Sequence, residues 1–141
     1  MENEGISTEP LHLALMAAAL QAASHAYAPY SKFRVGAALL LENGSIVRGA
    51  NVENASYGLT ICAERAAIGR AVAEHGPGMR ISAVAVANLN HADSSPCGAC
   101  RQVLAEFMPP AGLVLFPLGG ATHMSTMADL LPHSFGLGHG A

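Results

Sequence analysis

The sequence predicts an α/β protein, a three-layer α-β-α sandwich around a mixed five-stranded sheet, with residues 1–141 forming a single domain. Two observations support this fold class. Helix-like and strand-like segments alternate along most of the chain, and two of the strand-like runs are joined by a hairpin signal. A length of 141 residues with 51% hydrophobic content suits one domain with one packed core.

The first elements in order are a helix and a β-hairpin. Pro10 begins a run with an apolar face, and the run ends before "YAPYS" because Pro29 cannot continue a helix. Residues 33–53 then contain two runs rich in Val, Leu and Ile on either side of Asn43-Gly44. An Asn-Gly pair between two such runs is a strong hairpin signal.

The rest of the chain predicts helices and strands in alternation. A helix at residues 62–76 ends at Gly76, and one at residues 97–107 is stopped by Pro109-Pro110. The remaining predicted elements are buried strands "ISAVAVAN" (81–88) and "GLVLFPL" (112–118), a short strand near 120–124 and a last helix at 126–132.

The composition argues against nucleic-acid and membrane partners. The net charge is −3, and the seven Lys and Arg are spread singly along the chain, so no basic stripe is present for a polynucleotide. The apolar stretch of residues 11–26 is interrupted by polar residues and is too short for a membrane span. The first ten residues carry three Glu and no Lys or Arg, the wrong sign for a targeting peptide. We therefore expect a cytoplasmic protein that acts on a small ligand.

The chain has three cysteines, which in a reducing compartment are typical of a metal or catalytic site rather than of disulfides. Cys62 begins one predicted helix, and Cys97 and Cys100 lie in the first turn of another. Helix N-termini favour the thiolate form, and residues three apart share a helix face. Thiolates select zinc among common cellular metals. The three cysteines therefore predict a zinc site.

Three cysteines leave one of the four zinc positions open. A structural zinc site is closed by four protein ligands, whereas a catalytic site keeps a water whose pKa falls to about 7. None of the seven histidines lies at ligand spacing beside a cysteine, although one from elsewhere in the fold could still close the site. The cysteine set therefore favours a catalytic zinc site.

Glu64 lies two residues from Cys62 and can reach the same cavity without being a ligand. A carboxylate beside an activated water suits proton transfer, although a first-turn glutamate can also simply complement the helix dipole. Three thiolates on Zn²⁺ leave a net charge of −1. Arg65, Arg101 and the two helix N-termini can offset this charge by hydrogen bonding to the sulfurs.

Two short motifs, "CAER" at residues 62–65 and "PCGACRQ" at residues 96–102, resemble the cytidine deaminase family. Cysteine stands where the zinc deaminase signature has the histidine of His-x-Glu, which resembles the three-cysteine, small-subunit branch. The resemblance continues in order from about residue 26 to residue 135. The matching segments are "AYAPYSKFRVGAALL", "GANVENASYGLTICAERAAI", "SPCGACRQV" and "DLLPHSF".

The resemblance implies a reaction: hydrolysis of cytidine and 2′-deoxycytidine to uridine and 2′-deoxyuridine with release of ammonia, as in pyrimidine salvage. It implies that Cys62, Cys97 and Cys100 hold one zinc per chain. It also implies that Glu64 takes a proton from the zinc-bound water and returns protons to N3 of the pyrimidine and then to the departing amine.

The resemblance further implies a substrate pocket in which Asn51 and Glu53 bind the sugar. Residues two apart on a strand face the same way, and an amide beside a carboxylate can satisfy ribose hydroxyls, although polar residues are also ordinary at a hairpin end. Phe33 resembles the aromatic that packs against the pyrimidine, and its alternative is plain core. The backbone of Ala63 resembles the element that binds the amide near the base.

The small-subunit branch implies a homotetramer in which a phenylalanine from a neighbouring subunit completes each pocket. Phe135 is the matching position, and Tyr57 resembles another intersubunit contact. The sequence departs from the family pattern in "NLNHADSS" (88–95) and in the Gly/His-rich tail "GLGHGA" (136–141).

Three alternative functions share parts of this pattern. A deaminase of another aminopyrimidine nucleoside, such as blasticidin S, could use the same zinc core, but Asn51 and Glu53 favour an ordinary ribose. A polynucleotide deaminase would need a basic channel. A non-enzymatic zinc module would leave Glu64 and the missing fourth ligand unexplained.

Overall fold

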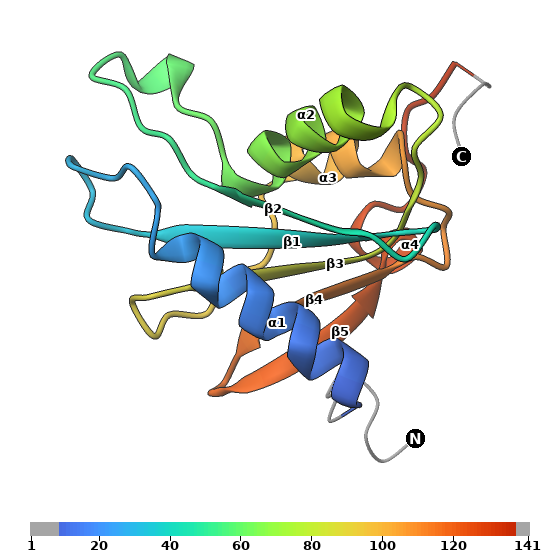
Figure 1. The fold of residues 1–141 in the computed structure, drawn as a ribbon, viewed down its shortest axis with the longest axis horizontal. Coiled ribbons are helices and arrows are strands. Elements are labelled where there is room, and N and C mark those ends of the chain that lie inside the picture. The colour runs from blue at the N-terminus through green and yellow to red at the C-terminus, as the bar shows by residue number, and fades with distance from the viewer. Residues whose placement is uncertain (1–8, 138–141) are drawn as a thin grey trace.

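One five-stranded sheet, in the order β2-β1-β3-β4-β5, forms the middle layer of the computed structural model, which describes residues 9–137 (Figure 1). Strands β3 and β4 are parallel, and the other neighbouring pairs are antiparallel, so the predicted mixed sheet is confirmed. Residues 138–141 of the predicted tail lie outside the described residues. The strands are β1 (Val35–Leu41), β2 (Ile46–Ala50), β3 (Ile81–Asn88), β4 (Leu113–Leu118) and β5 (Ala121–Thr126).

Helices cover both faces of the sheet, which confirms the predicted three layers (Figure 1). On one face Leu15 and Ala19 of α1 pack with Ala85 and Leu115 of the strands, and on the other Ala67 belongs to a second apolar core with α3. Among residues 9–137, no helix is both long enough and apolar enough to cross a membrane. The helices are α1 (Pro10–Ala23), the 3-10 helix η1 (Tyr57–Leu59), α2 (Ala63–His75), α3 (Gly98–Ala105) and α4 (Met127–Leu130).

Most element boundaries follow the sequence signals. Pro10 is the first residue of α1, and Gly76, with φ of 86°, caps the C-terminus of α2. Gly44, with φ of 91°, lies in the turn between β1 and β2. In each case the residue type suits the backbone conformation required at its own position. This requirement is local in sequence, which is why these positions could be predicted.

Three boundaries differ from the prediction. Helix α3 ends at Ala105 rather than continuing to the proline pair, because the amide of Phe107 bonds to the carbonyl of Leu104 in a tighter turn. Strand β5 runs on to Thr126 because it pairs with β4 along its whole length. Helix α4 begins one residue later than predicted, because the Thr126 side chain caps it by accepting from the amide of Asp129, and it ends at Leu130, where Leu131 leaves the helical conformation with φ of −143°.

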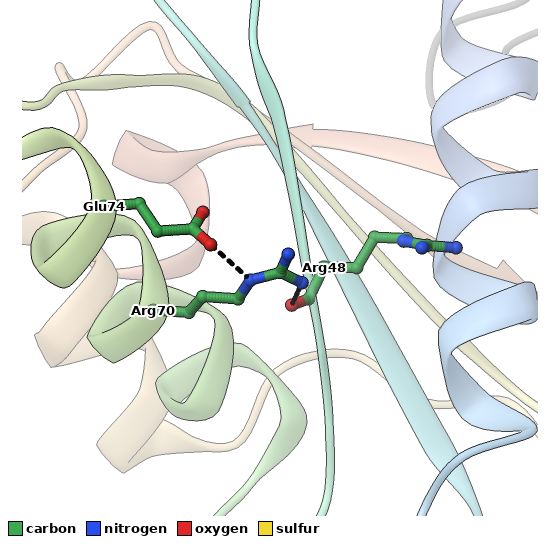
Figure 2. Close-up of polar contacts among 3 residues, drawn as sticks. All are labelled: Arg48, Arg70 and Glu74. Atoms are coloured by element: carbon green, nitrogen blue, oxygen red, sulfur yellow. Dashed lines mark hydrogen bonds and ion pairs between the residues drawn. The ribbon is translucent and has the colours of Figure 1, made fainter.

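Strand β2 is an edge strand held against both helix layers. At Gly49 a β-carbon would lie 2.5 Å from the backbone nitrogen of Ala67, so glycine is needed for α2 to pack this closely. Figure 2 shows Arg70 of α2 reaching the Arg48 carbonyl, with an N···O distance of 3.3 Å, and bonding to Glu74 at 3.0 Å. The Arg48 side chain extends the other way, toward α1 (Figure 2). These contacts fix the position of α2, whose first turn carries Glu64.

Candidate metal centre

The sulfur atoms of Cys62, Cys97 and Cys100 all lie within 4.8 Å of one another. Cys62 is the N-cap residue of α2, and Cys97 is the N-cap residue of α3 rather than part of its first turn as predicted. Cys100 lies in that first turn and is fully buried. The two helices therefore bring together, at their N-termini, the thiol of Cys62 and two thiols that follow it 35 residues or more along the chain.

The cysteine geometry fits a tetrahedral metal ion. Sulfurs bound to one zinc at about 2.3 Å in a tetrahedron lie about 3.8 Å from one another. The Sγ atoms of Cys62 and Cys97 are 4.0 Å apart. No histidine belongs to this group among residues 9–137. Among residues 9–137 the donor set is thus three sulfurs, which suits zinc and leaves a fourth position that none of these residues fills.

The surroundings of the thiols favour negative charge on Cys62. The hydrogen bond from the Cys100 thiol, supported by the Arg65 guanidinium, lowers the pKa of Cys62, and Arg65 Nη2 lies 3.3 Å from Cys62 Sγ. The hydrogen bond between the thiols of Cys100 and Cys62, together with the burial of Cys100, raises the pKa of Cys100. The amide of Cys100 donates to Cys97 Sγ at 3.5 Å. Arg65 therefore lies against the sulfur of Cys62, and its effect on the charge of a metal site stays a prediction.

Glu64 lies in the first turn of α2 beside the thiols and is only 4% exposed. Burial raises the pKa of its carboxyl to about 6, and the negative charge of Cys62 acts in the same direction. A carboxyl group that titrates near neutral pH can both accept and release a proton. The structure thus brings Glu64 next to the sulfurs without making it a member of the sulfur group.

Arg101 makes different contacts from those predicted. Its Nε donates to the carbonyl of Pro96 at 2.8 Å, Nη1 to the carbonyl of Leu130 at 3.0 Å, and Nη2 to the hydroxyl of Ser95 at 3.0 Å. Arg101 thus ties the loop that carries Cys97 to the end of α4. The hydrogen bonds of Arg101 go to oxygens rather than sulfurs, and its effect on the sulfur charge stays a prediction.

Asn51 and Glu53 both contact the segment that precedes β1. The Asn51 side chain accepts from the Val35 amide at 3.0 Å and donates to the Phe33 carbonyl at 2.9 Å. The Glu53 carboxylate accepts from the amides of Tyr30 at 3.0 Å and Ser31, and also from the Ser31 hydroxyl. These bonds lower the pKa of Glu53, with the Ser31 hydroxyl contributing most. Both side chains therefore bond to residues 30–35, although strand β2 has already ended, and their shared role at a sugar stays a prediction.

A pair of backbone hydrogen bonds connects this polar segment to the metal group, meaning the three cysteines that could hold a metal ion. Val52 and Ile61 bond to each other in both directions, with N···O distances of 2.9 Å, and Ile61 directly precedes Cys62. A cavity of about 320 Å³ opens on the loop that this pair closes, and its lining is Tyr30, Ser31, Glu53, Tyr57 and Thr60.

The aromatic candidates have different environments. Phe33 is half-buried beside the Asn51 contact, and Tyr57, 76% exposed, lies edge-on to Tyr30 with 6.4 Å between ring centroids. Phe135 is 71% exposed, and its carbonyl accepts from Gln102 Nε2 at 3.0 Å. Ala63 is fully buried as the first residue of α2.

Sequence reasoning missed Ser31 and Gln102. Both act through hydrogen bonds to residues 22 and 33 positions away, to Glu53 and to the Phe135 carbonyl. A serine in a loop and a glutamine on a helix are ordinary by themselves. No local pattern in one sequence identifies such partners.

Comparisons with known proteins agree with this geometry. A family model described as the cytidine and deoxycytidylate deaminase zinc-binding region matches residues 10–115. The chain is 50% identical over 123 residues to a cytidine deaminase of Halalkalibacterium halodurans, covering 86% of this chain and 91% of that one. It is 46% identical over 120 residues to a cytidine deaminase of Mycobacterium tuberculosis, covering 84% and 85%. The crystal structure of cytidine deaminase from Burkholderia pseudomallei matches with a TM-score of 0.79 at 46% identity, covering 88% of this chain and 98% of that one.

Proposed function

The chain belongs to the family of cytidine and deoxycytidylate deaminases, and from this premise we propose how its residues deaminate cytidine and 2′-deoxycytidine to uridine and 2′-deoxyuridine. Each turnover consumes one water and releases one ammonia. The observation that carries the proposal is the group of three sulfurs within 4.8 Å of one another, with the buried carboxyl of Glu64 beside it.

Cys62, Cys97 and Cys100 hold one zinc per chain in this proposal. The bound zinc supplies Lewis acidity, which lets water act as a nucleophile near neutral pH. Three thiolates would leave the site with a net negative charge, and the guanidinium of Arg65, 3.3 Å from Cys62 Sγ, offsets part of it. Arg101 contributes by holding the Cys97 loop and by its positive charge.

Glu64 moves the protons. It takes one from the attacking water as the oxygen bonds to C4 of the pyrimidine, and it gives a proton to N3. It then takes the second proton of the former water and delivers it to the amine, which leaves as ammonia when the C4–N bond breaks. Its buried position beside the sulfurs places it for this repeated uptake and release.

Asn51 and Glu53 bind the ribose. The Asn51 amide has one oxygen lone pair and one N–H left after its bonds to Val35 and Phe33. Glu53 lines the cavity of about 320 Å³, and its carboxylate accepts hydrogen bonds from the sugar hydroxyls. Phe33 packs against the pyrimidine ring. The backbone of Ala63 binds the amide near the base.

We propose that the working form is a homotetramer. Two exposed aromatic side chains lie at positions where the family resemblance implies intersubunit contacts: Tyr57 is 76% exposed and Phe135 71%. A neighbouring subunit would cover them, and its Phe135 would complete the pocket.

The same reasoning extends to the setting of the enzyme. Conversion of a cytosine nucleoside to a uracil nucleoside is a step that suits pyrimidine salvage. The three thiols must be reduced to bind zinc, which suits the cytoplasm.

Ammonia release from three substrates tests the proposal. The zinc-loaded protein is incubated with cytidine, with blasticidin S and with single-stranded DNA, and ammonia is measured in a coupled assay. Rapid release from cytidine alone is expected. Preferred release from blasticidin S would instead support deamination of another aminopyrimidine nucleoside, and release from none of them would overturn the proposal.

A further inference from the structure

The carboxylate of Glu53 is held by one short segment of its own chain. Oε1 accepts from the amide of Tyr30 at 3.0 Å and from the amide of Ser31 at 3.2 Å. Oε2 accepts from the hydroxyl of Ser31. Both backbone amides bond to Oε1, so the Ser31 hydroxyl is the group that restrains Oε2.

The Ser31 hydroxyl is itself held in place. It accepts from the amide of Phe33 at 2.9 Å while it donates to Glu53. Phe33 in turn gives its carbonyl to the Asn51 side chain at 2.9 Å. A chain of hydrogen bonds therefore runs from the proposed base-packing residue, through Ser31, to the proposed sugar-binding carboxylate.

Counting acceptor positions shows what this arrangement leaves for a ligand. A carboxylate has about four lone-pair positions, two on each oxygen. The two amides fill those of Oε1, and the Ser31 hydroxyl fills one of Oε2. One position on Oε2 remains, on a residue that lines the cavity of about 320 Å³. Glu53 thus presents a single directed acceptor rather than a freely rotating carboxylate.

We propose that Ser31 is a positioning residue that fixes Glu53 Oε2 to receive one ribose hydroxyl, and so determines the selectivity of the pocket for hydroxylated sugars. The inference rests on the proposed function, since it assumes that this cavity takes the sugar of a nucleoside. In this proposal Ser31 acts on the sugar through Glu53.

Binding of two products tests the proposal, because products bind without turnover. Uridine and 2′,3′-dideoxyuridine are titrated by calorimetry into the zinc-loaded parent, Ser31→Ala, Ser31→Thr and the control Ser45→Ala. Ser45 lies in the turn at the far end of β1 from the cavity. Zinc content and thermal unfolding are measured for each protein.

Ser31→Ala should weaken uridine binding about tenfold, as expected if the released Glu53 carboxylate loses its hydrogen bond from the ribose hydroxyl, and change dideoxyuridine binding less than about twofold. In steady-state assays it should raise KM for cytidine with little change in kcat. Ser31→Thr, which keeps the hydroxyl, and Ser45→Ala should match the parent.

Equal weakening for both products would overturn the proposal, because a loosened pocket would not distinguish the sugars. Unchanged uridine binding in Ser31→Ala would overturn it as well, as would failure of Ser31→Thr to restore binding. Absence of ammonia release from cytidine by the parent would instead refute the proposed function, whatever the variants show.

Discussion

Val52 and Ile61 bond to each other through both backbone N–H groups, at 2.9 Å in each direction, and so close the loop between the proposed sugar site and the metal group. On one side of this pair stand Asn51 and Glu53. On the other side Ile61 leads directly into Cys62. Because the two segments are bonded to each other at this point, a movement of one would move the other. The pair therefore gives a physical reason for a sugar site and a metal site to be adjacent.

The first prediction concerns the metal. The zinc-loaded protein should contain one zinc per chain, and X-ray absorption should find three sulfurs at about 2.3 Å and one lighter atom, because the described residues provide three sulfurs and no histidine. Replacing Cys100 by Ala should abolish stoichiometric zinc binding. Scattering from an imidazole ring in the first coordination sphere would contradict an open catalytic site.

Glu64→Gln should retain zinc and the fold but lose turnover by about 10²- to 10⁴-fold, because an amide cannot carry protons. Glu42→Gln is the control, since Glu42 is exposed in the hairpin turn. Initial rates of cytidine loss, together with zinc analysis, measure the effect. Activity of Glu64→Gln within a few-fold of the parent would show that another group moves the protons.

The raised pKa of Glu64 also predicts a pH-dependent stability of the metal-free protein. Below the ordinary value of 4.5 the carboxyl is protonated in both folded and unfolded chains, and it contributes no penalty. Between 4.5 and about 6 the folded chain keeps a proton that the unfolded chain has lost, so stability falls as pH rises. Above this window the loss in the free energy of unfolding is constant at about 2 kcal/mol.

In the metal-free state Glu64→Gln should therefore be more stable than the parent at pH 7.5, by up to about 2 kcal/mol, and equally stable at pH 4. Denaturant unfolding after treatment with a chelator measures both. Glu42→Gln, at an exposed position in the hairpin turn, is the control. A parent that is more stable than Glu64→Gln at pH 7.5 would reverse the sign of the argument.

Glu53→Ala should raise KM for cytidine at least tenfold while zinc content stays unchanged, because it removes the carboxylate that lines the cavity. The parent enzyme should act on cytidine far better than on free cytosine, which has no sugar to bind. Equal activity of the parent on both compounds would count against a sugar site at Glu53.

The sequence predicted the elements more accurately than the contacts between them. Pro10, the Asn43-Gly44 pair and Gly76 act on their own neighbouring backbone, so their effects can be inferred locally. The three cysteines could be assigned to one site because their chemistry requires a common metal ion, even without knowing the distance between them.

The contacts of Arg101 and Ser31 could not be predicted in the same way. Arg101 has several hydrogen-bond donors, and which acceptors it meets depends on how closely α4 approaches α3. Ser31 meets Glu53 only because the segment before β1 folds back against the end of β2. Such bonds are set by tertiary packing, and they account for most of what the sequence left open.

The last prediction concerns Phe135 and assembly. Its ring is 71% exposed, while its carbonyl is held by Gln102 on α3, the helix whose N-terminus carries Cys97 and Cys100. A ring that is anchored through its backbone yet exposed is suited to packing against another subunit. If it stacks on the base in a neighbour's pocket, Phe135→Ala should raise KM for cytidine about 5- to 150-fold and leave zinc bound, since such stacking contributes roughly 1–3 kcal/mol. Light scattering of the parent should give a mass near four times 14.4 kDa. A monomer with full activity would exclude this role, because no neighbour could then supply the ring.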